Sequence, residues 1–462
     1  MKDFIKKYYK QFIFIFIILI FDYLFYLKPI ISIDTENFIN DRTSLLTSWI
    51  GINRFSLVLL KNIFFIPFNI LVTRFLTIIF FYLSLISYSY LFTTWLKKDN
   101  KYLIYIISLI IGLSPILAEQ FSFTLQSLEI SLGFLLLSII FNLIDKFLNS
   151  SNKRLLILII PFLSFVFGLY QAFVPLFISL CCFYLLTHKK GFKELISIFI
   201  VSILLYYLTG FIFKNFIYHY TSNYLSNNFN WFNKSFIHNI LVIGYIGISS
   251  ILGLSIYHLS SYLIIFILGV IASIKKKKNL FLFFCLAVSP FLLNILTASS
   301  VAYRAQFNYV FSLTLMLIYL LNILSNKKLI NILYVISIAI IIREGLITFN
   351  LFYYDNIRYL SDVKLTSSIA KEIPPNSCLE FIGSLDESIK FKGETLGNSF
   401  YNWDSNGPLG SNIRINGLMK SLNYNYNIPS LEYYNSTKNL DIKEIEKVNE
   451  CYIVNLNNIK KD

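Results

Sequence analysis

Residues 69–98 read NILVTRFLTIIFFYLSLISYSYLFTTWLKK, an apolar run that ends at two lysines. Wound as a helix, this run is long enough to cross the hydrocarbon core of a membrane, which is about 30 Å thick. Similar runs recur from residue 12 to residue 342, and 56% of the 462 residues are hydrophobic. The mean hydropathy is +0.64. Since soluble domains are only roughly 45–50% apolar, the sequence predicts a polytopic membrane protein.

Lysine clusters between the apolar runs set the orientation of the predicted helices. Cytoplasmic loops are enriched in Lys and Arg, and one threading of the chain brings every basic cluster to that side. It predicts about eleven membrane-spanning helices, a cytoplasmic N-terminus and a C-terminal region outside. The predicted spans are residues 12–28, 69–96, 102–118, 128–146, 154–170, 172–187, 194–213, 256–274, 279–297, 306–324 and 328–347. The segment 237–255 is then interfacial or re-entrant, and the net charge of +15 belongs to cytoplasmic loops rather than to a nucleic-acid site.

The region after Phe349 differs from the rest, because it is rich in Asn, Ser, Tyr and Asp. Alternating runs at Cys378–Ile382 and 451–456 predict strands. The sequence therefore predicts an all-α polytopic membrane domain over residues 1–348 and a small extracytoplasmic α/β domain over residues 349–462. Cys378 and Cys451 are either a disulfide, as an oxidising compartment permits, or two reduced and buried thiols.

Two acids in the first outer loop are candidates for chemistry. Asp34 and Glu36 are two positions apart, so both carboxylates point to the same side of an extended segment. Such a pair suits shared metal binding, or a base with a second acid that orients it. The alternative is a solvated loop acid beside a helix cap. Arg54 follows in the same loop, before an apolar run at 55–68 that we predict to be re-entrant.

The second outer loop holds Glu119, Gln126 and Glu129 at the predicted depth of the membrane. Ionisable groups there are expensive to bury, so each faces either a water-filled cavity or a charged partner. For Glu129 the sequence favours a structural pair with a buried arginine such as Arg74.

Two further positions on the outer side carry polar side chains. Tyr170 and Gln171 occupy the turn between two spans, where a tyrosine is either an interfacial anchor or part of a binding pocket. Arg304 enters a helix from the outer side. A guanidinium at headgroup depth suits bidentate binding of a phosphate, and the alternative is an arginine that extends its charge to the interface.

Taken in order, these motifs resemble the O-antigen-modifying glucosyltransferase family of the glucosyl transferase II type, a branch of the GT-C-like membrane glycosyltransferases. The motifs that carry the resemblance are Ile33-Asp34-Thr35-Glu36 with Asn53-Arg54-Phe55, Ser114-Pro115 with 121–128 (FSFTLQSL), Gly168-Leu169-Tyr170-Gln171, and Arg304. The resemblance implies a bacterial plasma (inner) membrane enzyme that takes a sugar, classically glucose, from a polyprenyl phosphate. The implied acceptor is a surface glycan or glycolipid on the outer face.

The resemblance also gives roles to the candidate residues in an inverting transfer. Asp34 is the expected general base on the acceptor hydroxyl, and Glu36 orients that base or the acceptor. Arg304, with Arg54, is expected to neutralise the departing phosphate. The residues expected to bind substrate are Arg54, Glu119, Gln126, Tyr170, Gln171 and Arg304. The resemblance gives no certain cofactor, and a divalent cation at the acidic pair stays open.

Two other functions share parts of this pattern. A carrier or flippase of a lipid-linked or anionic substrate is the alternative, and it predicts polar residues on both sides of the midplane and often an inverted repeat. The polar residues here are predicted on one side, and the sequence shows no repeat and no nucleotide-binding motif. A membrane polysaccharide polymerase shares most features of the transferase, and only its product would differ.

Overall fold

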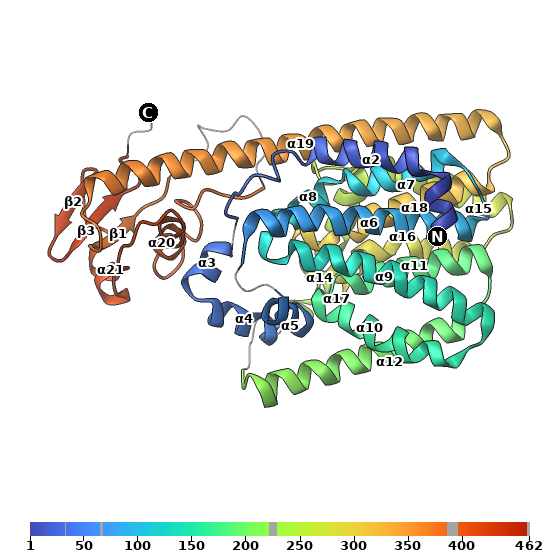
Figure 1. The fold of residues 1–462 in the computed structure, drawn as a ribbon, viewed down its shortest axis with the longest axis horizontal. Coiled ribbons are helices and arrows are strands. Elements are labelled where there is room, and N and C mark those ends of the chain that lie inside the picture. Colours follow the sequence, from blue (N-terminus) through green and yellow to red (C-terminus); the bar gives the residue numbers. More distant parts are fainter. Residues whose placement is uncertain (33, 65–67, 221–228, 386–395, 460–462) are drawn as a thin grey trace. The chain divides into compact units, whose positions relative to one another are not determined.

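The computed structural model describes the whole chain apart from residues 33, 65–67, 221–228, 386–395 and 460–462. The fold is mostly helical and divides into two compact units (Figure 1). Unit 1 comprises Met1–Leu24, Thr47–Phe121 and Gln126–Thr348. Unit 2 comprises Phe25–Leu46, Ser122–Leu125 and Phe349–Asp462. The long helix α19 (Lys327–Glu372) contributes to both.

The described helices before α19 cover most of the chain. They are α1 (Lys2–Lys7), α2 (Tyr9–Asp22), α3 (Thr35–Asn40), α4 (Arg42–Gly51), α5 (Phe55–Phe64), α6 (Ile70–Leu96), α7 (Lys101–Gly112), α8 (Pro115–Ser122), α9 (Thr124–Ser150), η1 (Lys153–Leu155), α10 (Leu156–Leu169), α11 (Phe173–His188), α12 (Phe192–Ile212), η2 (Phe213–Ile217), α14 (Phe236–Leu252), α15 (Ser261–Lys275), α16 (Leu280–Val288), η3 (Ser289–Phe291), α17 (Leu292–Thr297), η4 (Tyr303–Gln306) and α18 (Asn308–Ile323).

The apolar run within residues 69–98 forms α6, and local interactions determine where this helix begins and ends. Asn69 caps the first turn, because its side chain accepts a hydrogen bond of 3.0 Å from the Val72 N–H. The helix ends where Lys97 turns into the left-handed region with a φ of 51°. The next predicted span, 102–118, forms two helices, α7 and α8, bent by 46° relative to each other. Pro115 starts α8, a position where its missing N–H has no helical partner to lose.

The predicted number of spans is confirmed only in part. Among the described residues, six helices are long and apolar enough to cross a membrane, or seven if the bent pair of α7 and α8 is one span. Three further apolar helices, α11, α14 and α15, are shorter. Helix α2 has 14 residues and rises only about 21 Å, less than a hydrocarbon core. Eleven spans therefore stay a prediction.

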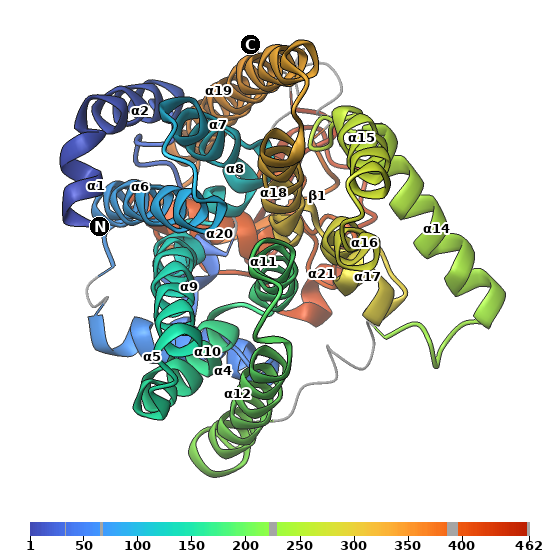
Figure 2. The same cartoon turned by 90° about the vertical axis from the view of Figure 1, so that its right-hand side faces the viewer.

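Unit 1 is a helical bundle with a well-buried interior and an apolar exterior. Figure 2 shows its long helices nearly end on, with α11 and α18 inside the bundle and α12 and α14 at its edge. Every residue of α18 from Asn308 to Leu321 is buried. By contrast, α12 exposes large apolar side chains, including Leu204 at 63%. An exposed apolar surface of this kind fits a lipid environment.

The C-terminal part of unit 2 contains a small sheet. The predicted strands are confirmed as β1 (Cys378–Ile382) and β3 (Cys451–Asn455), which pair in parallel. A third strand, β2 (Ile445–Val448), which the sequence pattern did not predict, pairs antiparallel with β3. Cys378 and Cys451 lie opposite each other in the parallel register and form a disulfide, which decides between the two alternatives left open.

Two short helices, α20 (Asn412–Ser421) and α21 (Leu431–Thr437), accompany the sheet. A small apolar core joins β1 and β3 to α21 and consists of Ile382, Tyr434, Ile442 and Ile453. The predicted boundary between domains at residues 348 and 349 stays a prediction, since segments 25–46 and 122–125 group with the C-terminal region.

Candidate functional site

Asp34 and Glu36 lie at the start of α3 in unit 2. Asp34 adopts a left-handed conformation with a φ of 65°, and its N–H donates a hydrogen bond of 3.2 Å to Glu36 Oε1. The Asp34 side chain is 26% exposed, whereas the Glu36 side chain is fully buried. The Asp34 carboxylate is therefore accessible to a ligand. The Glu36 carboxylate is buried and accepts a hydrogen bond from the Asp34 backbone.

Side-chain hydroxyl groups form the hydrogen bonds that hold the loop before α3 in place. Ser32 Oγ lies 3.2 Å from Thr35 Oγ1. It also accepts a hydrogen bond of 3.2 Å from the backbone N–H of Thr124, the first residue of α9. Thr124 belongs to the second predicted motif, so unit 2 brings parts of the first two motifs together.

Arg414, on α20, contacts both acids of the first loop. Its Nη1 donates to Glu36 Oε1 and lies 3.4 Å from Asp34 Oδ1. Its Nε donates a hydrogen bond of 2.6 Å to Asp404 Oδ2. Helices α3 and α20 pack against each other, which brings these groups together. Three carboxylates thus share one guanidinium, so the cluster carries excess negative charge.

The buried acid of this cluster titrates near neutral pH. Burial raises the pKa of Glu36 to about 7, and the charge and hydrogen bond of Arg414 oppose that rise. The ionisation of Glu36, and with it the charge of the cluster, therefore depends on Arg414.

Sequence reasoning did not identify Arg414 as a site residue. It lies 378 positions from Glu36, in the stretch Ser411-Asn412-Ile413-Arg414-Ile415, which matches no motif. The one available signal was an isolated arginine in a region rich in Asn and Ser. That signal does not say which acids the arginine meets.

Four of the predicted substrate-binding residues form a cluster in unit 1. Arg54 Nη1 donates a hydrogen bond of 3.1 Å to Gln126 Oε1, and the guanidinium lies 4.5 Å from the centre of the Tyr170 ring. Gln171 Nε2 donates to the Ile52 carbonyl and, at 3.1 Å, to the Tyr206 hydroxyl. The structure therefore unites three predicted motifs at this cluster.

Close packing of α5 on α10 builds this cluster. Gly168, the first residue of the motif 168–171, lies against α5. A Cβ at this position would be 2.5 Å from Ser56 Oγ. A larger side chain would push apart the two helices that carry the Arg54 loop and Tyr170. The glycine therefore positions the cluster, although it has no polar group to offer.

Arg304 and Glu119, the remaining predicted residues, form an ion pair in unit 1. Arg304 Nη1 lies 3.5 Å from Glu119 Oε1, with the side chains 35% and 12% exposed. Neighbours hold the η4 turn that carries Arg304, because Tyr303 stacks on Tyr257 with ring centres 4.5 Å apart. Gln306 Nε2 donates a hydrogen bond of 2.8 Å to the Val301 carbonyl. The arginine is thus fixed at its backbone while its side chain stays partly exposed.

Glu129 forms a different kind of pair. Its Oε1 lies 2.7 Å from Lys61 Nζ, and both side chains are fully buried. The predicted structural ion pair is confirmed, but the suggested partner Arg74 is wrong. Lys61 lies on α5, and helix packing rather than sequence proximity brings it to α9. This pair has no access to a substrate.

The described residues offer no evident metal centre. Within that part of the chain, no group of three or more His, Cys, Asp and Glu side chains is arranged to hold a metal ion. The structure therefore identifies no ligand set for the divalent cation that the acidic pair left open.

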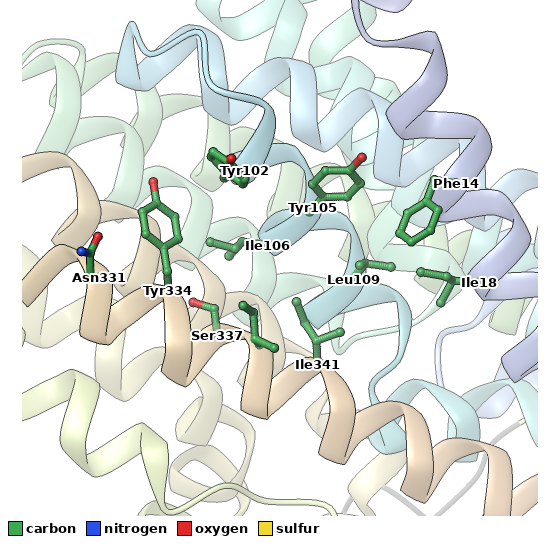
Figure 3. A pocket seen from close by; sticks show the side chains of 11 residues that line it. Phe14, Ile18, Tyr102, Tyr105, Ile106, Leu109, Asn331, Tyr334, Ser337 and Ile341 are labelled. Atoms are coloured by element: carbon green, nitrogen blue, oxygen red, sulfur yellow. The ribbon is translucent and has the colours of Figure 1, made fainter.

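An apolar groove of about 630 Å³ opens between α2, α7 and α19 in unit 1. Figure 3 shows Asn331 and Tyr334 toward one end and Ile18 and Ile341 toward the other. None of the described residues that line it is charged. The groove can hold a hydrocarbon chain but has no group for acid-base chemistry, so it does not belong to the candidate site.

The family model described as glucosyl transferase GtrII matches residues 23–323. The chain belongs to this glucosyltransferase family. The match confirms the resemblance drawn from the motifs, and it gives no support to a carrier or flippase. No curated protein and no solved structure matches the chain.

All eight predicted site residues lie within the part matched by the GtrII family model, whereas Arg414 lies outside it. The structure assigns Asp34 and Glu36 to unit 2 and the other six residues to unit 1. That all eight line one catalytic site of this GtrII family member stays a prediction.

Proposed function

We propose that this chain is a membrane glycosyltransferase that moves a sugar, glucose by family name, from a polyprenyl phosphate to a surface glycan or glycolipid. Membership of the GtrII family supports glycosyl transfer. The observation that carries the mechanism is the acidic pair, in which Asp34 is accessible while Glu36 is buried and bonded to the Asp34 backbone. A general base must reach its substrate, and a second acid that fixes the position of this base keeps it oriented for proton transfer.

In the proposed reaction the acceptor hydroxyl attacks the anomeric carbon of the donor sugar. Asp34 takes the hydroxyl proton as the new carbon–oxygen bond forms. The bond between the anomeric carbon and the phosphate oxygen breaks, and its electron pair leaves with the phosphate. Attack from the face opposite the phosphate inverts the anomeric centre. Glu36 holds the Asp34 backbone, and Arg414 favours the ionised form of Glu36.

The departing phosphate gains negative charge that a cation must stabilise. Arg304 suits this task because its side chain is about one-third exposed and Glu119, its acidic partner, is largely buried. A phosphate can replace or share this partner, since guanidinium binds both groups in the same bidentate way. In the proposal Arg54, Gln126, Tyr170 and Gln171 bind the sugar and its phosphate.

The proposed location of the chemistry is the outer side of the plasma membrane. The Cys378–Cys451 disulfide supports this location for the C-terminal region, because disulfides persist in oxidising compartments and are rare in the cytoplasm. The lysine clusters support a cytoplasmic position for the opposite ends of the helices. An acceptor on the cell surface is then within reach of Asp34 and Arg414.

The proposal is tested with membranes that contain the full-length protein. They are incubated with glucosyl polyprenyl phosphate and with surface polysaccharide from a strain that lacks this gene, and the product is analysed by mass spectrometry and NMR. We expect one added hexose with an inverted anomeric centre. Arg304→Ala should lower the transfer rate about 10²-fold or more, as expected when a charge stabiliser is lost.

A matched control is Arg343→Lys. Arg343 is 37% exposed and pairs with the buried Glu344, much as Arg304 pairs with Glu119. We expect this variant to keep its activity per molecule of protein. Equal activity of Arg304→Ala and the wild type would overturn the role of Arg304, and transfer from a nucleotide sugar instead would overturn the proposed donor.

A further inference from the structure

A second cavity lies in unit 2, outside the part of the chain matched by the family model. It has a volume of about 470 Å³ and is lined by residues of the loop 398–407. Its walls combine one indole ring, Trp403, with the polar side chains of Asn398, Asn402, Asp404, Ser405 and Asn406. Ligand sites commonly have volumes of about 300–1,000 Å³. An aromatic ring surrounded by amide groups suits a sugar, whose apolar face stacks on the ring while its hydroxyls bind the amides.

The amide groups of this pocket are available for a ligand. Within the described part of the chain, the side chains of Asn398, Asn402 and Asn406 form no hydrogen bond. Each amide offers a donor and an acceptor group, which matches the two roles of a sugar hydroxyl. The Trp403 ring is half-buried, so it forms a wall rather than a mobile surface side chain.

The pocket is built on a rigid base. Asp362, on α19, accepts hydrogen bonds of 2.6 Å from Ser399 Oγ and 3.2 Å from the Phe400 N–H. The Ser399 carbonyl then accepts from the N–H groups of Asn402 and Trp403 at 3.0 and 2.9 Å. A pocket that is already ordered loses less entropy when a ligand binds. This loop therefore has the pre-organisation that a binding site needs.

Arg414 joins the pocket to the candidate catalytic acids. Its Nε binds Asp404, a residue of the pocket wall, and its Nη1 contacts Asp34 and Glu36. The guanidinium carbon also lies 5.9 Å from the centre of the Trp403 ring. The pocket and Asp34 are thus separated by a single side chain within one compact unit.

From these observations we propose that the Trp403 pocket binds a neutral sugar of the acceptor glycan and presents the next hydroxyl of that glycan to Asp34. The proposal rests on the proposed function, because it uses Asp34 as the base. It adds a binding site for the acceptor that lies entirely in the C-terminal region.

The charge of the cluster favours an acceptor sugar over the donor. Asp34, Glu36 and Asp404 surround one arginine, Arg414, so the excess charge at this end of the pocket is negative. A donor phosphate would be repelled there. A neutral sugar has no such penalty, and its hydroxyls can donate hydrogen bonds to Asp404.

The proposal is tested by measuring binding separately from transfer. The probe is the polysaccharide chain, freed of its lipid, from a strain that lacks this gene. It is titrated calorimetrically, without the lipid donor, into purified full-length Asp34→Asn protein. Adding Asn402→Ala or Trp403→Leu should raise the Kd about tenfold, the expected effect of one lost hydrogen bond or stacking contact of about 1.4 kcal/mol. Asn425→Ala is the matched control, because Asn425 is an exposed amide of the same unit outside the pocket.

Steady-state kinetics in the wild-type background give the second measurement. Both pocket variants should raise the KM for the polysaccharide about tenfold and leave the KM for the lipid donor unchanged. Unchanged Kd and KM in both variants would overturn the pocket while leaving the transferase assignment intact. Binding that the pocket variants abolish, in a protein that transfers nothing from polyprenyl phosphate, would support the pocket and overturn the proposed donor.

Discussion

Arg358 and Arg414 each bind carboxylates within unit 2. Only the cluster around Arg414 contains carboxylates that are exposed to solvent. Arg358 donates to Asp355 Oδ1 from Nε and Nη2, at 3.1 and 2.8 Å, and to Asp362 Oδ2 from Nη1, at 3.2 Å. The three side chains are between 4% and 7% exposed. Around Arg414 the exposed fractions are 0% for Glu36, 26% for Asp34 and 50% for Asp404.

The difference separates a buried charge cluster, around Arg358, from a partly exposed one, around Arg414. Asp362 also accepts hydrogen bonds from Ser399 and Phe400, so its oxygens are already occupied. Asp34 instead keeps an exposed carboxylate beside a buried acid that titrates near neutrality. In the proposed mechanism the same residue types fix a loop in one place and offer a base in the other, and the two clusters differ in their access to solvent.

The largest expected effect on the transfer rate is at the partly exposed cluster around Arg414. Asp34→Asn removes the proposed base while keeping the size of the side chain, so the rate of transfer in membranes should fall about 10²- to 10⁴-fold. The amount of folded protein, measured by size-exclusion chromatography in detergent, should not change. An active Asp34→Asn variant would mean that the two clusters do not differ in function.

A substitution in the buried cluster around Arg358 should instead lower the stability of the protein. Asp362→Ala leaves Arg358 buried with one partner fewer and removes the acceptor for Ser399 and Phe400. Breaking a buried ion pair in this way costs about 3–5 kcal/mol. We expect a lower melting temperature and faster proteolysis at the loop 398–407. Because this loop forms the Trp403 pocket, the KM for the polysaccharide should rise, while kcat in the molecules that remain folded should stay near normal. Unaltered stability would contradict the structural role of this cluster.

The pH dependence of transfer should sharpen the difference. Burial raises the pKa of Glu36 to about 7, so acidification through that range protonates Glu36 and should lower activity. Arg414 opposes the rise in this pKa, and Arg414→Gln should therefore move the acidic limb of the pH profile to higher pH. The measurement is the transfer rate between pH 5 and 9. An acidic limb at the same pH in both proteins would show that Arg414 does not control the ionisation of the pair.

The smallest effect is expected at Asp41, an acid of the same loop as Asp34. Its Oδ1 caps α4 by accepting a hydrogen bond of 3.0 Å from the Ser44 N–H, and the residue is exposed. Asparagine keeps this cap, so Asp41→Asn should change transfer by less than about twofold, as for most surface substitutions. A large loss at Asp41 would show that the general charge of the loop, rather than the Asp34 position, matters.

Much of the fold could be predicted because the signals are local. Long apolar runs and lysine clusters located helices such as α6 and α9, and the alternating runs located β1 and β3. The pattern missed β2, a strand of only four residues with two charged side chains. It also named Arg74 rather than Lys61 as the partner of Glu129, because a motif does not say which helix packs opposite it.

The sequence by itself determined that the protein is a polytopic membrane protein, which residue types are available for chemistry, and the glucosyltransferase family, because composition, periodicity and short motifs are properties of contiguous segments. Only the tertiary structure decided that Cys378 pairs with Cys451, that Arg54 meets Tyr170 and Gln126, and that Arg414 holds the first-loop acids. These contacts join positions far apart in the chain. Their energies depend on burial and on the excess of carboxylates around one cation, and both arise only when the helices and the sheet have packed.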